Sequence, residues 1–172
     1  RGIDGADSDF HAVCGLQPRP ATVRMRLLDP VLRAQLRGLG DISAPVADVA
    51  KLGLAPDTLM IVENLQSGLA LPDMTGTVAL MGLGYAVSAI AHIPWLRGVP
   101  GLYWGDIDTH GFAILHRART YLPQLSSVLM DEATMRRFAE LWTEEGSPHA
   151  APALDMLTPS ESAVYRALRD NT

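Results

Sequence analysis

Three carboxylates are the residues of this sequence best suited to chemistry. Asp106 and Asp108 are separated by one residue, and they follow the apolar run 102–104 and a glycine. Glu63 directly follows another apolar run, 58–62. Side chains two positions apart in an extended chain point the same way, so the two aspartates are expected on one side. Carboxylate oxygens are the ligands that Mg²⁺ prefers, so these residues predict a site for Mg²⁺ or Mn²⁺.

The same acidic turn also has a purely structural interpretation. Residues 109–122 carry apolar side chains at helical spacing, so a helix should begin directly after the turn. Asp108 or Thr109 would then be the N-cap residue that accepts hydrogen bonds from the first helical turn. A single Asp-x-Asp pattern is common, and the sequence alone leaves both interpretations open.

The elements that must position these carboxylates alternate between strand and helix. Strands are expected at 21–28, 58–62, 77–83, 102–104 and 126–130, and helices at 31–39, 41–56, 65–71, 85–96, 109–122, from 131 onward, and 159–169. This alternation predicts an α/β domain with a mainly parallel four-stranded sheet flanked by helices, with the first strand at its edge. The carboxyl ends of parallel strands meet at one edge of the sheet. Glu63 and the two aspartates should therefore share that edge.

The rest of the chain gives weaker signals of organisation. Residues 1–20 are rich in Gly, Asp and Pro and are expected to be a linker, while 21–172 form a single domain. Asp131 should cap a helix with one apolar face, made of Met135, Phe138, Ala139 and Trp142. Thr158 and Glu161 form a capping box for the last helix.

Composition bounds the possible functions. The 172 residues carry a net charge of −5, which argues against strong autonomous DNA binding but not against a nuclease site that uses metal ions. The single cysteine excludes an internal disulfide and fits a cytoplasmic protein. No apolar run reaches the length of a membrane span. Because there is no initiator Met, we expect a piece of a longer protein.

The scarcity of lysine argues against two other classes of α/β site with strand-end aspartates. Haloacid-dehalogenase-like phosphatases and phospho-receiver domains place a lysine downstream of these aspartates, and no lysine follows Lys51. The sequence also lacks the Gly-rich loop that binds nucleotide phosphates. The sequence does not exclude a Mg²⁺-dependent phosphotransferase of another type.

Three short motifs resemble a known family. VEN at 62–64, GLG at 82–84 and GDIDTHG at 105–111 resemble the motifs of a Toprim domain. The similarity is greatest to the topoisomerase VI A subunit and its meiotic relatives, whose third motif reads D-x-D-P-H-G; Thr109 stands in place of the proline. RGID at 1–4, RLLDP at 26–30 and GLGDIS at 38–43 make the chain similar to the C-terminal domain of JetD, the Toprim subunit of the Wadjet anti-plasmid system.

The resemblance implies a Toprim-like, Rossmann-like fold and roles for the acidic residues. Glu63 would be the catalytic carboxylate, acting as general acid and base or sharing a metal. Asp106 and Asp108 would hold Mg²⁺ or Mn²⁺ against the scissile phosphate. The topoisomerase relatives use a tyrosine on a separate winged-helix domain, which this chain does not contain, so metal-activated water is the expected nucleophile.

The resemblance also implies a set of substrate-binding residues. They are Asn64, Gly82, Gly84, His110 and Gly111. Asn64 could orient Glu63, touch phosphate or cap a helix. His110 could contact the DNA backbone or pack locally, and the helix that begins there has N-terminal amides that favour an anion.

The implied function is metal-dependent cleavage of plasmid DNA within a bacterial defence complex. The implied partners are DNA, SMC-type or condensin-like subunits and a second copy of the chain, with no membrane. The alternative is a Toprim-like interaction module that docks SMC-type partners and has little activity alone. The acidic net charge favours the alternative, and the acidic triad favours the nuclease.

Overall fold

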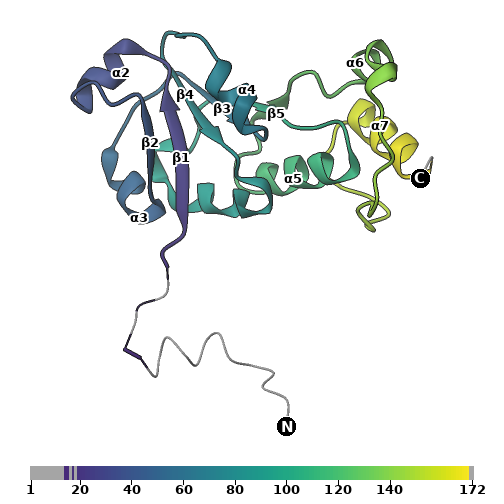
Figure 1. Ribbon diagram of the computed structural model, residues 1–172, viewed down its shortest axis with the longest axis horizontal. Coiled ribbons are helices and arrows are strands. Elements are labelled where there is room, and N and C mark those ends of the chain that lie inside the picture. Colours follow the sequence, from purple (N-terminus) through teal and green to yellow (C-terminus); the bar gives the residue numbers. More distant parts are fainter. Residues whose placement is uncertain (1–13, 16, 18, 171–172) are drawn as a thin grey trace.

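The computed structural model describes residues 14–15, 17 and 19–170 (Figure 1). Its strands are β1 (Thr22–Leu27), β2 (Asp41–Pro45), β3 (Thr58–Val62), β4 (Thr77–Met81), β5 (Gly101–Trp104) and β6 (Leu125–Ser127). Its α-helices are α2 (Pro30–Gln35), α3 (Val46–Val49), α4 (Leu65–Ala70), α5 (Thr109–Arg119), α6 (Glu132–Arg137) and α7 (Pro159–Asp170). Short 3₁₀ helices are η1 (Ala50–Leu52), η2 (Gly84–His92), η3 (Pro94–Leu96) and η4 (Ala139–Leu141). Most of the linker expected at 1–20 lies outside the described residues.

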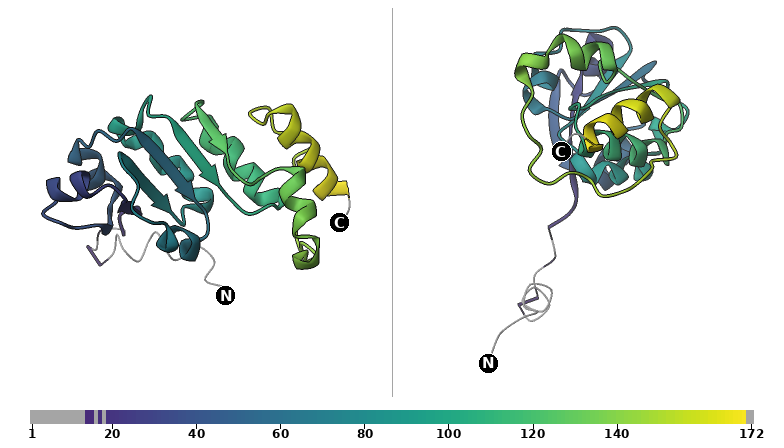
Figure 2. Two further views of the ribbon diagram at one scale, coloured as in Figure 1. Left: turned by 90° about the horizontal axis from the view of Figure 1, so that it is seen from above. Right: turned by 90° about the vertical axis from the view of Figure 1, so that its right-hand side faces the viewer.

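All six strands form one mixed sheet in the order β2-β1-β4-β3-β5-β6. The four strands β4, β3, β5 and β6 run parallel, while β1 and β2 are antiparallel to their neighbours. The prediction of an α/β fold with a parallel four-stranded core is therefore confirmed. The elements are spread along the long axis, with β1, β2 and α2 at one end and α6 and α7 at the other (Figures 1 and 2).

The core lies on both faces of the sheet because the central strands are buried on both sides. Leu59 and Ile61 of β3 point to the larger core, which α3, η2, α5 and α7 cover. Met60 and Val62 point to a smaller core on the opposite face. This is why β3 is a continuous apolar run and not an alternating one.

The prediction that β1 lies at the edge of the sheet is wrong, because residues 41–45 add a strand outside it. The expected helix 41–56 is strand β2 followed by the short helices α3 and η1. Half-buried Ile42 and Ala44 alternate with exposed neighbours, which is the strand period. Arg24 of β1 holds β2 in register through an ion pair with Asp41, with 2.6 Å between Nη2 and Oδ2.

Two other expected elements differ in kind or length. The helix expected at 85–96 is two 3₁₀ helices, because Pro94 disfavours helical geometry at the preceding Ile93, which is extended. The strand expected at 126–130 is β6, which is shorter and ends before Leu129, whose φ is +59°.

The C-terminal elements begin where the capping residues predict. The Asp131 side chain accepts a hydrogen bond from the Thr134 amide, and Thr158 and Glu161 form the reciprocal bonds of a capping box. The apolar face expected on the helix after Asp131 is not buried, however, since Phe138 and Trp142 are exposed. In the described part of the chain, no helix has the length and apolar character needed to cross a membrane.

Candidate functional site

The structure brings the three predicted carboxylates to one edge of the sheet. Glu63 follows β3, and Asp106 and Asp108 follow β5. These strands are parallel neighbours, with Val62 opposite Trp104. The Glu63 amide donates to the Trp104 carbonyl over 2.9 Å, which continues the pairing to the edge.

Glu63 has a partly buried carboxylate that Tyr103 holds in place. The fully buried Tyr103 hydroxyl donates to Glu63 Oε2 over 2.9 Å. Burial raises the pKa of Glu63, the negative charges of Asp106 and Asp108 raise it further, and the hydrogen bond from Tyr103 partly offsets the rise. Burial and the nearby Glu63 carboxylate also raise the pKa of the Tyr103 phenol, which keeps it a donor. The sequence predicts Tyr103 only as a core residue and does not indicate its hydrogen bond to Glu63.

The two aspartates have different surroundings. Asp108 caps α5, as its structural interpretation predicts, because its Oδ1 accepts from the Gly111 amide over 2.6 Å. Asp106 as a whole residue is exposed, but neighbouring atoms shield its carboxyl partly from water, and this desolvation together with the charge of Asp108 raises its pKa. Capping does not exclude metal binding, because a carboxylate has two oxygens with two lone pairs each.

The carboxylates of Glu63, Asp106 and Asp108 are chemically suited to bind a hard divalent cation, but they do not form a complete coordination site. Among the described residues, no three His, Cys, Asp or Glu side chains lie close enough together to hold a metal ion. The negative charge of Asp108 contributes to the raised pKa values of both Glu63 and Asp106, and a cation between the carboxylates would relieve this repulsion. Oxygen-only donors are those that Mg²⁺ prefers.

Two glycines let the carboxylates approach the backbone this closely. A Cβ on Gly105 would lie 2.6 Å from Glu63 Oε2 and 2.6 Å from Tyr103 Cε1. A Cβ on Gly111 would lie 2.2 Å from the Asp106 carbonyl oxygen. Both distances are far below van der Waals contact, so the shape of the acidic turn requires glycine at both positions. Gly111, predicted to bind substrate, thus has a packing role.

Three other predicted substrate-binding residues lie at the same edge. Asn64 caps α4, because its Oδ1 accepts from the Ser67 amide over 3.0 Å. Gly82 and Gly84 follow β4, with φ of +64° and +48°, and turn the chain away from the sheet. The Gly82 amide donates to the Val62 carbonyl over 3.0 Å, next to Glu63.

His110 is held by contacts at both ring nitrogens. Its Nδ1 hydrogen-bonds the Tyr85 hydroxyl, and its Nε2 lies 2.8 Å from the Ser147 carbonyl oxygen. A carbonyl only accepts, so Nε2 is the donor of the hydrogen bond to Ser147. His110 thus links η2 to the loop before α7.

A fourth carboxylate, which the sequence does not single out, occupies the first turn of α5. Glu145 accepts hydrogen bonds from the Thr109 amide over 3.1 Å and from its hydroxyl over 2.7 Å. Proline at position 109 could make neither bond. The first turn of α5 therefore already binds an anionic group. These partners are 36 positions apart in the chain, so no local pattern in the sequence indicates their contact.

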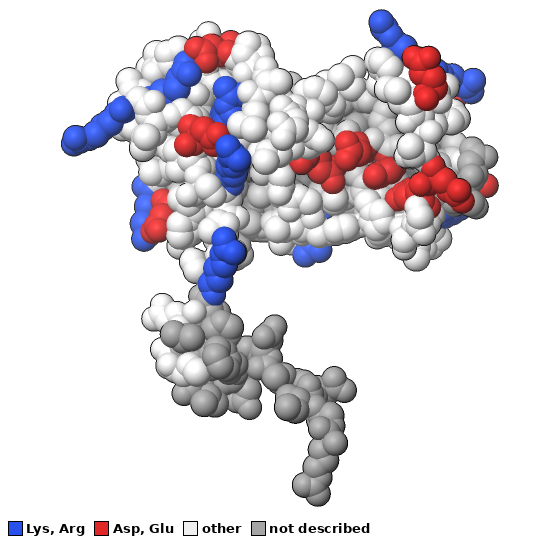
Figure 3. All heavy atoms as spheres, viewed as in Figure 1, with Lys and Arg blue, Asp and Glu red and all other residues white. Residues whose placement is uncertain are grey.

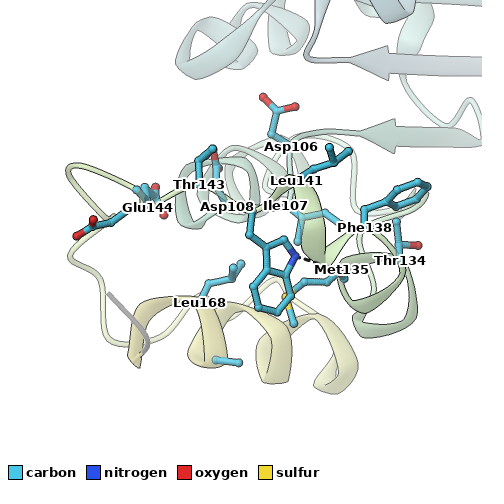
Figure 4. Close-up of a pocket in the computed structure, with 13 residues that line it drawn as sticks. Asp106, Ile107, Asp108, Thr134, Met135, Phe138, Leu141, Thr143, Glu144 and Leu168 are labelled. Atoms are coloured by element: carbon cyan, nitrogen blue, oxygen red, sulfur yellow. Dashed lines mark hydrogen bonds between the residues drawn. The ribbon is translucent and has the colours of Figure 1, made fainter.

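A cavity of about 560 Å³ opens beside the aspartates, between α6, α7 and the loop that joins η4 to α7 (Figure 4). Its lining includes Asp106, Ile107 and Asp108. The Asp106 carboxylate points away from the apolar side chains of the cavity (Figure 4).

Surface charge is unevenly distributed around this site. On the face shown in Figure 3, acidic side chains form a band between the sheet and α7, and no Lys or Arg side chain lies within that band. Carboxylates close to phosphate repel it unless cations intervene.

Comparison with known proteins identifies the family. A search of the curated proteins found no match to the chain. The family described as "Wadjet protein JetD, C-terminal" matches residues 15–172, which is nearly the whole chain and includes all three carboxylates. The chain therefore belongs to the family of Wadjet JetD C-terminal domains.

Proposed function

We propose that this chain is a Toprim-type, metal-dependent DNA endonuclease domain of an anti-plasmid complex. The observation that carries the proposal is the meeting of Glu63, Asp106 and Asp108 at the carboxyl ends of two adjacent parallel strands. Membership of the JetD family supports a place in Wadjet defence and plasmid DNA as the substrate.

The aspartates are the residues that would hold Mg²⁺ or Mn²⁺, with Glu63 beside them. A divalent cation bound there would stabilise the negative charge that develops on the phosphate and on the leaving oxygen. The Glu145 carboxylate on the first turn of α5 supports the idea that this helix end also accepts a phosphate.

Glu63 is the residue that we assign to proton transfer. Its burial and its acidic neighbours raise its pKa, so it keeps or takes a proton closer to neutral pH than an ordinary glutamate. The hydroxyl of Tyr103 fixes one of its oxygens, which leaves the other to face the substrate.

A second candidate function is an interaction module that docks SMC-type subunits and has little activity alone. Two observations favour it for the isolated chain. The net charge is −5, and phosphate contacts from Lys and Arg supply most non-specific DNA affinity. Among the described residues, no three potential metal ligands are gathered closely enough to form a site on their own.

Plasmid cleavage by the assembled complex tests the proposal. The full-length protein is combined with its partner subunits and supercoiled plasmid in Mn²⁺, as wild type, Glu63→Gln or Asp106→Ala. We expect each substitution to slow cleavage by about 100-fold or more, as loss of acid–base or metal chemistry does. The isolated chain should cut weakly at most.

Glu132→Gln is the matched control, because Glu132 lies in an exposed ion pair with Arg136 and does not line the cavity beside the aspartates. It should leave cleavage unchanged. Cleavage that survives both Glu63→Gln and Asp106→Ala would overturn the assignment, and it would leave the interaction module as the function.

A further inference from the structure

Three exposed large apolar side chains, Phe138, Leu141 and Trp142, line the cavity beside α6 and α7. We call this cavity the α6–α7 groove; its lining is Asp106, Ile107, Asp108, Thr134, Met135, Phe138, Leu141, Trp142, Thr143, Glu144, Glu145, Ala167 and Leu168. Phe138, Leu141 and Trp142 are 46%, 70% and 59% exposed. Figure 4 shows Phe138 and Leu141 on one wall and Leu168 of α7 on the opposite side.

These side chains are held in place and are not loose ends of a loop. The Trp142 indole N–H donates to the Met135 carbonyl over 2.9 Å, drawn as a dashed line in Figure 4. Arg137 lies over the Phe138 ring, 5.8 Å from its centroid. An apolar face that is both ordered and exposed indicates a binding surface.

The border of the groove is acidic. Glu144 and Glu145 contribute carboxylates, Asp106 and Asp108 stand at the end of the groove that meets the acidic turn, and the lining contains neither Lys nor Arg. Of the two arginines of α6, Arg136 forms an ion pair with Glu132, and Arg137 lies over the Phe138 ring. The groove therefore combines an apolar floor with an unbalanced negative border.

This combination selects the chemistry of the occupant. A nucleic-acid backbone inside the groove would meet the carboxylates of Glu144 and Glu145 and no Lys or Arg side chain. A wholly apolar partner would remove those carboxylates from water without pairing them, which is costly. A segment that carries both apolar and cationic side chains can cover the apolar side chains of the groove and pair with its carboxylates.

Aromatic anchors such as Trp and Phe mark the centre of protein–protein contacts. The groove's volume of about 560 Å³ is enough for several side chains of such a segment. The chain also belongs to a family that acts in a multi-subunit defence system.

We propose that the α6–α7 groove docks a basic, apolar polypeptide segment of another subunit of the complex. The partner's apolar side chains lie against Phe138, Leu141 and Trp142, and its Lys or Arg side chains face Glu144 and Glu145, beside the aspartates that the proposed function assigns to the cation. The inference rests on the chain's place in the complex and not on its cleaving DNA.

Site-specific crosslinking in the full-length protein tests the docking. Leu141 is replaced by the photo-crosslinker p-benzoylphenylalanine, the protein is irradiated with the other purified subunits and plasmid DNA, and the crosslinked products are identified by mass spectrometry. The expected product joins position 141 to one segment of another subunit that contains both apolar residues and Lys or Arg. The matched control is Val31 of α2, which is 71% exposed at the opposite end of the molecule and should not give this product.

Four results would overturn the proposal: no crosslink, crosslinks only to a second copy of the chain, crosslinks only to DNA, or a segment lacking either kind of side chain. A binding measurement without DNA or added metal is the second arm. Trp142→Ala should weaken binding of the partner subunit by about tenfold or more, while Val31→Ala should not change it. Unchanged affinity of a folded Trp142→Ala protein would also contradict the proposal. Neither arm reads cleavage, so failure here is separate from failure of the nuclease assignment.

Discussion

Glu63 lies between a phenol that binds its carboxylate and two aspartates that repel it. Residues that function requires are often unfavourable for the stability of the free protein. A carboxyl with a raised pKa destabilises the fold when it is ionised. This cost increases as pH rises through the folded pKa, and it is absent at acidic pH where Glu63 is protonated.

We therefore predict that Glu63→Gln stabilises the metal-free protein at pH 7. Glutamine keeps an acceptor for Tyr103 but carries no charge. The midpoint of thermal unfolding should rise by about 3 °C, the shift that about 1 kcal/mol produces in a domain of this size. The gain should disappear at pH 4. A lower midpoint at pH 7 would contradict the electrostatic account of Glu63, and Glu132→Gln serves as the neutral control.

Gly105 gives a second prediction at the residue scale. Gly105→Ala places a Cβ 2.6 Å from both Glu63 Oε2 and Tyr103 Cε1, so both groups must move. We expect a loss of about 1–3 kcal/mol in the free energy of unfolding, typical of overpacking, and slower plasmid cleavage. Gly146→Ala is the matched control, because nothing lies within 4 Å of a Cβ there. Urea unfolding of both variants checks this, and equal stabilities would contradict it.

The sequence predicted the candidate carboxylates but not the groups that hold them. Residue type and strand ends located Glu63 and Asp106. The contact with Tyr103 depends on the register of β3 and β5, which places Ile61 opposite Tyr103. Nothing local in the sequence specifies that register. For Asp108 the sequence left helix capping and metal binding as alternatives, and the two are compatible. One carboxylate oxygen caps α5, and lone pairs remain that could bind a cation.

At the scale of elements, a buried ion pair joins the C-terminal end of α5 to α7. Arg119 binds Glu161 through two hydrogen bonds of 2.6 and 2.9 Å, and both side chains are buried. Burial alone would raise the pKa of Glu161, but hydrogen bonds from Arg119, Ser127 and the Thr158 amide lower it to about 2. Because the pKa is lowered, the stabilisation is complete above the ordinary value and is lost as pH falls from 4.5 toward 2.

Glu161→Gln should therefore destabilise the protein by about 3 kcal/mol at pH 6, because it leaves Arg119 buried without its charge partner. The difference from wild type should shrink as pH falls toward 3. Urea unfolding at several pH values measures this. The exposed pair of Glu132 and Arg136 is the control, and Glu132→Gln should change stability by less than about 0.5 kcal/mol. A pH-independent difference for Glu161→Gln would contradict the pKa assignment.

The elements that the sequence predicted well have strong local signals. Buried apolar runs identified β3 and β4, and the capping residues Asp131 and Thr158 located the starts of α6 and α7. β2 was missed because the helical spacing of the residues that follow it extended the helix prediction backward. Its strand conformation depends on pairing with β1, a non-local contact.

At the scale of the whole molecule, a parallel sheet gathers negative charge at the edge where its strands end. The four parallel strands bring their carboxyl ends to one side, and the Glu63 carboxylate and the acidic turn lie there. The apolar face left exposed on α6 and η4 borders the same region. We infer that a cation balances the negative charge at the edge of the sheet and that a partner subunit covers the exposed apolar face.

The position of Mn²⁺ in crystals of the protein tests directly whether Glu63, Asp106 and Asp108 form a site for a divalent cation. Crystals are soaked in Mn²⁺, and an anomalous difference map is calculated. If these carboxylates hold the cation, we expect a peak between Glu63 and the two aspartates, within about 2.5 Å of carboxylate oxygens. Asp106→Ala crystals should show no such peak. A map of the ordered acidic turn with no peak there, both in the protein alone and bound to DNA, would contradict it.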